Sequence, residues 1–240
     1  SLDDMTNELQ KRISHAENFS TDLVHEIRNP LTSLKSASEI LHETENQEQR
    51  IKLIDILNHD VQRIERLITD YSQMLKDEVA LSKEKMKKIN LKLFIKSVVD
   101  DFNNIYETKR GIKIILSDLN DLDEYNIYGI ENRIEQIIAN LLDNSISFSD
   151  DNKKILVQIS KNENKEIILK VIDEGKGFKE KNTKKIFNRF YSNRPDNFGK
   201  HSGLGLNIVK NLVDLHGGTI NAYNNTTQKG ANVEITFPKS

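Results

Sequence analysis

The first eighty residues arrange apolar and polar positions in the rhythm of amphipathic helices. Between Leu2 and Ala80 the chain is almost free of glycine and proline, and apolar residues recur at spacings of three and four. The clearest series alternates these spacings as a heptad seam: Ile54, Leu57, Val61, Ile64, Ile68, Tyr71 and Leu75. A polar run from Glu43 to Glu48 interrupts the pattern. We therefore predict two helices that lie antiparallel, because their connection is short.

Two helices by themselves leave part of their apolar surface open to water. A dimer of two such hairpins buries this surface in a four-helix bundle, which is the arrangement that we expect. The alternative is a monomeric hairpin that packs against the rest of the chain.

Beyond residue 88 the pattern changes to alternating helices and strands. The charged run from Lys83 to Lys88 predicts a linker, so a first domain covers residues 1–82 and a second covers residues 87–240. The predicted helices of the second domain are Leu91–Thr108, Glu131–Phe148 and Gly203–His216. Its predicted strands are Ile112–Leu116, Ile155–Ser160, Ile167–Asp173, Thr219–Tyr223 and Asn232–Phe237. Hairpin strands with helices between them predict an α+β chain whose helices stack on one face of a mixed sheet.

Composition excludes several classes of function. The 240 residues include 35 basic and 37 acidic side chains, and the net charge of -2 gives no reason to expect a nucleic-acid partner. The absence of cysteine excludes disulfides and thiolate metal sites. No run approaches the ~18 apolar residues of a membrane span. Because the chain begins with Ser1 rather than methionine, we expect a fragment whose membrane anchor lies upstream.

A histidine and a carboxylate stand side by side on the first predicted helix. The apolar residues around them share one face of that helix: Leu23, Ile27, Leu31 and Leu34. His25 lies about 200° around the helix from Leu23, so it points away from this face. An outward histidine beside Glu26 can act as a nucleophile whose neighbour orients or accepts its proton. An ordinary surface histidine on an amphipathic helix is the alternative.

Two motifs in the second domain carry groups suited to nucleotide binding. Asn140 and Asn144 are four residues apart and share a helix face, where amides can ligate Mg²⁺ or donate to phosphate. Asp173 ends an apolar strand and can accept from an exocyclic amine such as that of adenine, while Gly175 and Gly177 let the backbone approach a ligand. Solvent-facing asparagines, a calcium loop or an ordinary turn would give the same patterns.

A third motif, Gly203-Leu204-Gly205-Leu206, opens a helix whose N-terminal N–H groups can bind phosphate. The long stretch from Phe178 to Ser202 before it is typical of a mobile lid. Within this stretch Arg189 can reach a phosphate, and the neighbouring aromatic residues either anchor the lid or belong to the core. The spacing is neither that of a Walker A loop nor that of a Rossmann fingerprint.

The order of these motifs is more specific than any one of them. A helical hairpin with H-E-x-x-N-P, then N-x-x-x-N, D-x-G-x-G, F-x-R-F and G-x-G, resembles the cytoplasmic core of two-component sensor histidine kinases over nearly the whole chain. The local sequences VHEIRNPLTSLKSA, DNSISFS, FYSNRP and HSGLGL are most similar to the ChvG-type members of that family.

The resemblance implies a dimerisation and histidine phosphotransfer domain at residues 1–82, formed by a dimeric four-helix bundle. It implies a catalytic ATP-binding domain at residues 87–240, with the GHKL (Bergerat) α/β sandwich that gyrase and MutL-type ATPases share. The implied function is autophosphorylation by ATP and transfer of the phosphoryl group to an aspartate of a response regulator. The implied partners are a second copy and that regulator, without nucleic acid. The implied location is the cytoplasmic part of an inner-membrane sensor, with no membrane contact in this fragment.

The resemblance also assigns roles to residues. His25 would attack the γ-phosphate through Nε2, Glu26 would orient the ring through Nδ1 and take up its proton, and Asn29 would assist dephosphorylation of the regulator. The residues that would bind ATP are Asn140, Asn144, Asp173, Gly175, Gly177, Arg189, Lys200, Gly203, Leu204, Gly205 and Leu206. Asn144 would also ligate Mg²⁺.

One departure from the family pattern concerns the phosphate contacts. Family members often carry lysine and tyrosine where this chain has Ser147 and Phe148, and Lys200 or His201 could substitute for the lysine. Two other functions stay open: a non-catalytic relative with a degenerate ATP site, and a clamp or chaperone ATPase of the same fold. The intact motifs argue against the first, and the outward His25 in a dimeric hairpin argues against the second.

Overall fold

The computed structural model describes residues 2–81, 84–119, 124–179, 182–189, 191, 203–226 and 229–239. Contacts between residues separate two compact units, the first covering residues 1–78 and the second the described chain from Val79 onward. The domain boundaries predicted at residues 82 and 87 stay a prediction. No helix within these described ranges is long and apolar enough to cross a membrane.

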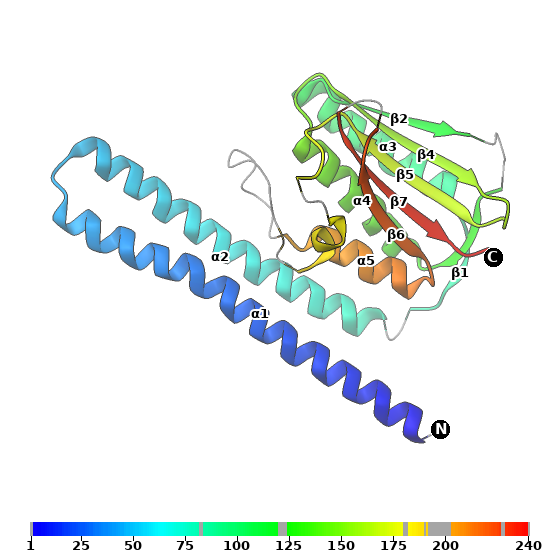
Figure 1. Cartoon of the computed structure of the whole chain (residues 1–240), viewed down its shortest axis with the longest axis horizontal. Coiled ribbons are helices and arrows are strands. Elements are labelled where there is room, and N and C mark those ends of the chain that lie inside the picture. The colour runs from blue at the N-terminus through cyan, green and yellow to red at the C-terminus, as the bar shows by residue number, and fades with distance from the viewer. Residues whose placement is uncertain are drawn as a thin grey trace. The chain divides into compact units, whose positions relative to one another are not determined.

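The first unit is a hairpin of two long helices, α1 (Leu2–Glu43) and α2 (Gln47–Leu81), as the sequence predicted (Figure 1). The turn is closed by Arg50, whose Nη1 donates to the carbonyl oxygens of Leu41 and Thr44 at 3.0 Å each. Asn46 caps α2, because its Oδ1 accepts from the backbone N–H of Gln49 at 3.1 Å. These bonds explain why the polar run ends one helix and starts the next.

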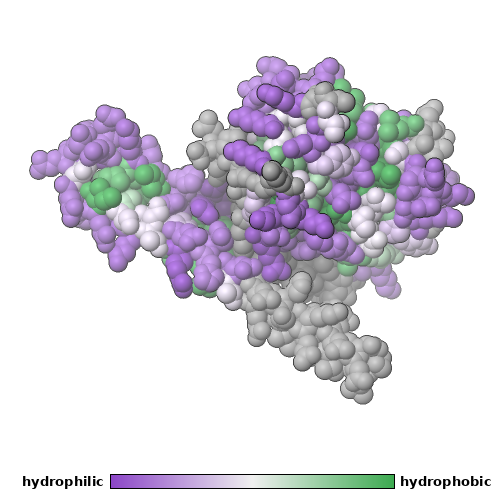
Figure 2. All heavy atoms as spheres, viewed as in Figure 1, coloured by the Kyte–Doolittle hydropathy of each residue, from purple (hydrophilic) through white to green (hydrophobic). Residues whose placement is uncertain are grey.

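The heptad seam of α2 divides into an inner and an outer stripe. Leu57, Ile64 and Tyr71 are half-buried, whereas Ile54, Val61 and Ile68 are 45%, 46% and 50% exposed. Leu75 lies outside the described side chains. Figure 2 shows hydrophobic side chains exposed on the hairpin among hydrophilic ones. The hairpin therefore buries one half of its apolar pattern and presents the other half to its surroundings.

Leu31 departs from the face of α1 that it was predicted to share with Leu23, Ile27 and Leu34, which are half-buried. Leu31 is 51% exposed, whereas Pro30 one residue earlier is buried. The residues of α1 that face inward alternate spacings of four and three: Leu23, Ile27, Pro30, Leu34, Ala37 and Leu41. Pro30 holds the central position in this series, so Leu31 falls on its flank, about 100° around the helix.

The second unit contains two sheets and three helices, with a short 3-10 helix η1 (Thr183–Phe187). Its helices are α3 (Leu91–Arg110), α4 (Glu131–Phe148) and α5 (Gly205–Leu215). Its strands are β1 (Lys87–Asn90), β2 (Lys113–Asp118), β3 (Asn126–Gly129), β4 (Lys154–Lys161), β5 (Ile167–Asp173), β6 (Thr219–Asn224) and β7 (Ala231–Phe237). The large sheet has the order β2-β4-β5-β7-β6, and the small sheet pairs β1 with β3.

The large sheet is mixed, as predicted, because β2 runs parallel to β4 while every other pair is antiparallel. The three helices pack on one face of this sheet (Figure 1). Alternate residues of β5, from Ile167 to Val171, are buried on that face, and the residues between them are half-exposed. Isoleucine and leucine residues of α4 belong to the same core cluster as these buried residues of β5, among them Ile134, Ile138 and Leu141.

The small sheet was not predicted. In β1 the sequence Lys-Lys-Ile-Asn buries only Ile89, so four residues give too short an alternation to indicate a strand. Lys87 and Lys88, the last residues of the predicted linker, therefore belong to β1 and pair with Gly129 and Tyr128 of β3.

The chain just before β1 is bound to the first turn of α4. Glu84 accepts from the Asn132 amide at 3.0 Å and from Arg133 Nε at 3.3 Å. Lys87 Nζ lies 2.6 Å from Glu131 Oε2. Three consecutive residues of α4 thus hold the segment that enters the second unit.

Candidate functional site

His25 lies on α1 with its side chain exposed, as the sequence predicted. Among the residues that the structure describes, it has no hydrogen-bond partner. Pro30 follows little more than one turn later and carries no N–H, so the carbonyl of Glu26 loses its usual helical partner. The imidazole is accessible to a reactant from outside the hairpin.

Glu26 faces the second helix rather than the solvent. Its carboxylate is 26% exposed, and its Oε2 accepts from Nη2 of Arg63 on α2 at 3.0 Å. The sequence analysis missed Arg63, although it adjoins the seam residue Ile64 and could have been placed near the interface on that ground. Asn29 is exposed on α1, four residues after His25.

A buried carboxylate lies one turn from Arg63 on the same helix. Asp60 is 7% exposed, and its Oδ2 has no hydrogen-bond partner among the described residues. Its Oδ1 is 3.8 Å from His59 Nδ1, which is beyond hydrogen-bond distance.

In the second unit, the helices α4 and α5 bring two of the predicted motifs together. Asn140 and Asn144 are both half-buried on α4. A Cβ added to Gly205 at the start of α5 would lie 3.6 Å from Asn140 Oδ1. The N-terminus of α5 therefore lies beside the asparagine face of α4, although 65 residues of sequence separate Asn140 from Gly205.

Asp173 ends β5 with its carboxylate fixed by backbone donors. Its Oδ1 accepts from the N–H groups of Gly175 at 2.9 Å and Ala231 at 3.0 Å. No described residue bonds to Oδ2, so this oxygen can accept from a ligand. Burial raises the pKa of the Asp173 carboxyl above its ordinary value, and the two backbone hydrogen bonds partly oppose that rise.

Glycines around Asp173 permit close approaches that a side chain would block. A Cβ on Gly175 would lie 2.5 Å from the carbonyl oxygen of Phe148 at the end of α4, and Gly177 has a φ of +74°. A Cβ on Gly230, which the sequence analysis did not select, would lie 1.9 Å from the Asp173 carbonyl oxygen. Only glycine fits these positions, which form the turn after β5 and its contact with β7.

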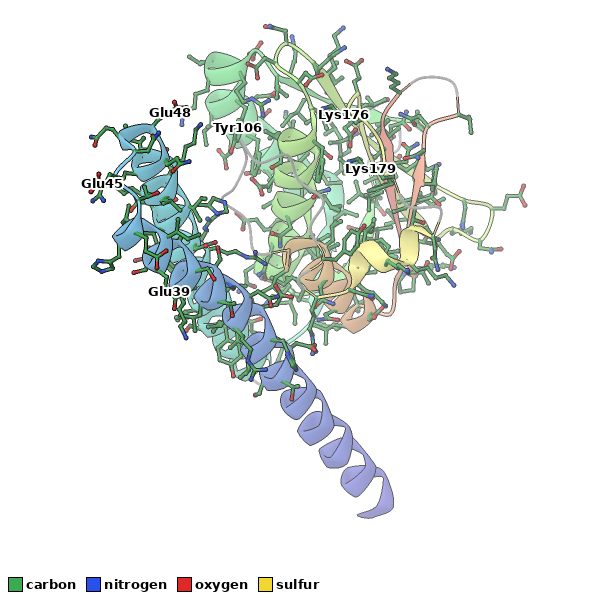
Figure 3. The ribbon with its side chains drawn as sticks, turned by 60° about the vertical axis from the view of Figure 1, so that its left-hand side comes forward. Glu39, Glu45, Glu48, Tyr106, Lys176 and Lys179 are labelled. Carbon is green, nitrogen blue, oxygen red and sulfur yellow. The ribbon has the colours of Figure 1, made fainter. Side chains whose placement is uncertain are left out.

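The chain after this turn is held by Asn224, another residue that the sequence analysis missed. Its Oδ1 accepts from the N–H of Phe178 at 2.6 Å, and its Nδ2 donates to the Phe178 carbonyl at 2.9 Å. Lys176 and Lys179 are exposed in this segment. Figure 3 labels both lysines, together with Tyr106 of α3. Burial, then the charge of Asp143, raises the pKa of Tyr106.

The far end of the segment is anchored in the core. Ile186 and Phe187 of η1 are buried, and Asn207 of α5 donates to the Phe187 carbonyl at 2.8 Å. Of the two interpretations of the aromatic residues, Phe187 therefore fits the core. Arg189 is half-buried just beyond η1. Lys200 and His201 lie outside the described residues.

The start of α5 is suited to an anion. Gly203 has a φ of +78°, Leu204 is buried, and Leu204 at the N-cap makes no side-chain hydrogen bond to the helix. The first N–H groups of α5, which include those of Gly205 and Leu206, are thus not capped by that side chain. The predicted helix began two residues earlier, at Gly203.

Ser147 does not present a polar group to this site. Its side chain is buried, and its hydroxyl donates to the Asp143 carbonyl one turn back in α4 at 2.7 Å. The Ser147 hydroxyl is therefore engaged within α4.

Comparisons with known proteins match a different family to each part of the chain. Residues 16–84 match the family described as the His Kinase A (phospho-acceptor) domain. Residues 129–240 match the family described as the histidine kinase-, DNA gyrase B-, and HSP90-like ATPase. The second unit is thus an ATPase domain of this class, and it follows a phospho-acceptor domain.

Similar proteins include two sensor proteins named ChvG. The one from Rhizobium meliloti is 37% identical over 93% of this chain and 40% of its own length. The one from Agrobacterium fabrum is 35% identical over 93% of this chain and 38% of its own length. The histidine kinase ThkA, solved in complex with response regulator protein TrrA, is 23% identical, with a TM-score of 0.66 over 96% of this chain and 64% of that chain.

The chain therefore belongs to the sensor histidine kinases, and its resemblance to the ChvG-type members is confirmed. It spans about 40% of the length of these curated relatives.

Proposed function

We propose that this chain phosphorylates His25 with ATP and passes the phosphoryl group to an aspartate of a response regulator. The observation that carries the proposal is the exposed His25 next to Glu26 on α1, inside the segment that matches the phospho-acceptor family. In this proposal residues 1–82 form the dimerisation and phosphotransfer domain, and residues 87–240 form the catalytic ATP-binding domain.

The residues of the second unit suit ATP. Asp173 Oδ2 accepts from the adenine amine while Gly175 and Gly177 shape the pocket around the base. Asn140, Asn144 and Arg189 contact the phosphates, together with the N–H groups at the start of α5 and, from outside the described residues, Lys200. Two observations support this assignment: no described residue bonds to Asp173 Oδ2, and the side chain of Leu204 does not cap the start of α5. Asn144 would hold a magnesium ion, which would supply positive charge to the phosphate oxygens.

The phosphotransfer to His25 follows from its exposure. With the ring proton on Nδ1, the Nε2 lone pair attacks the γ-phosphorus and forms an N–P bond. The bond from phosphorus to the β,γ-bridging oxygen breaks, and ADP leaves with that electron pair. The Nδ1 proton passes to Glu26. In the second transfer, a regulator carboxylate attacks phosphorus, the N–P bond breaks and His25 regains its proton.

Two partners belong to the proposal. A second copy covers the outer stripe of the hairpin, where Ile54, Val61 and Ile68 are exposed. A response regulator docks beside His25, and Asn29 positions the water that removes phosphate from it. We also propose that this chain is the cytoplasmic portion of an inner-membrane sensor whose membrane anchor lies upstream.

The test is incubation with γ-labelled ATP and Mg²⁺, comparing the natural chain with His25→Ala. We expect label that is lost in acid, stable in base and absent from the variant. A chain that binds ATP but takes up no label would contradict the kinase and leave the non-catalytic relative.

A further inference from the structure

A cation from α2 holds the residue next to the phosphoacceptor. Arg63 Nη2 lies 3.0 Å from Glu26 Oε2, and this bond joins the two helices of the hairpin. The guanidinium bonds to Glu26 across the interface, although Asp60, three residues away on its own helix, has an oxygen with no partner among the described residues. The bond therefore selects Glu26 over a carboxylate that is close in sequence.

The exposure of the pair argues against a purely stabilising role. The Arg63 side chain is 44% exposed and that of Glu26 is 26% exposed. Ion pairs with such access to water contribute little to folding, because solvent screens them and the long side chains lose conformational freedom. What the pair does provide is a fixed orientation for the Glu26 carboxylate, since a guanidinium presents its donors in a rigid fork.

The orientation of Glu26 matters because its side chain can adopt several rotamers that point its carboxylate in different directions. Residues 25 and 26 project about 100° apart on the helix, and a free glutamate side chain samples many rotamers. With Oε2 bound to Arg63 of α2, the carboxylate is held at the interface between the two helices, and Oε1 is left without a partner among the described residues. A base that is already in position avoids the entropy cost of finding its proton.

We propose that Arg63 is a positioning residue for the autophosphorylation of His25. It anchors one oxygen of Glu26 so that the other receives the Nδ1 proton. This inference rests on the proposed function and adds to it a residue of α2 that touches neither ATP nor the imidazole.

The test measures initial rates of His25 labelling against ATP concentration for Arg63→Met, Arg63→Lys, Glu26→Gln and the double variant Glu26→Gln with Arg63→Met. General bases contribute about 10²- to 10⁴-fold, and we expect Arg63→Met to lose roughly tenfold or more of kcat while KM for ATP stays unchanged. Arg63→Lys should recover part of the rate. The double variant should be no slower than Glu26→Gln alone, because Arg63 acts through Glu26.

Lys52→Met is the matched control, because Lys52 is a cation of α2 that pairs within its own helix, with Glu48 Oε1 at 2.7 Å. It should label at the natural rate. The inference is overturned if Arg63→Met labels as fast as the natural chain, if its loss adds to that of Glu26→Gln, or if only KM changes. Failure of the natural chain to label at all would instead refute the proposed function, so the two failures are distinct.

Discussion

Asn29 stands about one helical turn from His25 on α1, and its exposed amide can orient a water toward a phosphorylated regulator. Asn29→Ala removes that amide without touching His25 or Glu26. We expect autophosphorylation to persist while regulator dephosphorylation slows by about tenfold, a loss typical of a missing positioning hydrogen bond. Both rates can be followed with labelled protein and purified regulator. Equal loss of the two activities would show that Asn29 does not serve dephosphorylation alone.

His216 is a buried histidine with both ring nitrogens engaged. Nε2 accepts from the N–H of Ile130 at 3.1 Å, and Nδ1 bonds to the Leu212 carbonyl at 2.6 Å, which requires the neutral ring with its proton on Nδ1. Burial lowers the pKa of His216, although the bond to the Leu212 carbonyl opposes this. A proton on Nε2 would place two donors face to face and remove the hydrogen bond from the Ile130 N–H.

Because the folded pKa lies below the unfolded value near 6.5, the unfolded chain binds more protons in that range. Stability is therefore fully present above about pH 6.5 and declines as pH falls, by up to about 1.4 kcal/mol per pH unit. Urea unfolding of the natural chain between pH 5 and 8 measures this slope. His216→Gln, whose amide does not titrate, should flatten it, and an unchanged slope would exclude His216 as its source.

Asp60 is a buried carboxylate whose Oδ2 has no partner in the described part of the chain, and such an oxygen is costly in a folded protein. Asp60→Leu replaces it with an apolar group of similar size, and we expect the free energy of unfolding to rise by about 1–3 kcal/mol. Asp55→Leu, at an exposed position of α2, is the control and should change stability little. A lower free energy of unfolding for Asp60→Leu would contradict this account of the Oδ2 oxygen.

At the scale of elements, the open edge of the large sheet is closed by a side chain. Asn103 of α3 donates from Nδ2 to the Ile114 carbonyl at 2.9 Å and accepts the Ile114 N–H on Oδ1 at 2.8 Å. Ile114 belongs to β2, an edge strand, so the amide takes the place of a neighbouring strand at that residue.

Asn103→Ala should leave both backbone groups of Ile114 without their protein partner. We expect the free energy of unfolding to fall by about 1–2 kcal/mol and aggregation on heating to increase. Asn104→Ala, an exposed neighbour on the same helix, is the control. Urea unfolding and light scattering measure the two effects, and identical behaviour of the two variants would contradict the edge-capping role.

At the scale of the whole molecule, the exposed stripe of the hairpin predicts self-association. Ile54, Val61 and Ile68 are seven residues apart and stay open to water in the single chain. Val61→Glu with Ile68→Glu places charge on this stripe and should convert a dimer into a monomer. The matched control is Gln62→Glu with Thr69→Glu, at the exposed positions next to each change. Mass measurement by light scattering decides, and a natural chain that is already monomeric would favour the packed hairpin.

The sequence alone determined the elements, because their signals are local. Periods of three to four residues predicted α1, α2 and α4. For α4 the predicted bounds, Glu131 and Phe148, are those observed. The family was also determined at this level, since H-E-x-x-N-P, D-x-G-x-G and G-x-G are short runs in a fixed order. Strands as short as β1 and β3 escaped because four residues carry too little periodicity.

Only the tertiary structure decided which groups meet. Arg63 bonds to Glu26 from 37 residues away, and Asn103 bonds to β2 from another element. The Asp173 carboxylate takes an N–H from Ala231, which is 58 residues distant. Such bonds depend on packing between elements, and the same residue types at the same spacing would satisfy the sequence pattern without them. The heptad of α2 shows the same limit, because the pattern named its apolar residues while packing against α1 decided which half is buried.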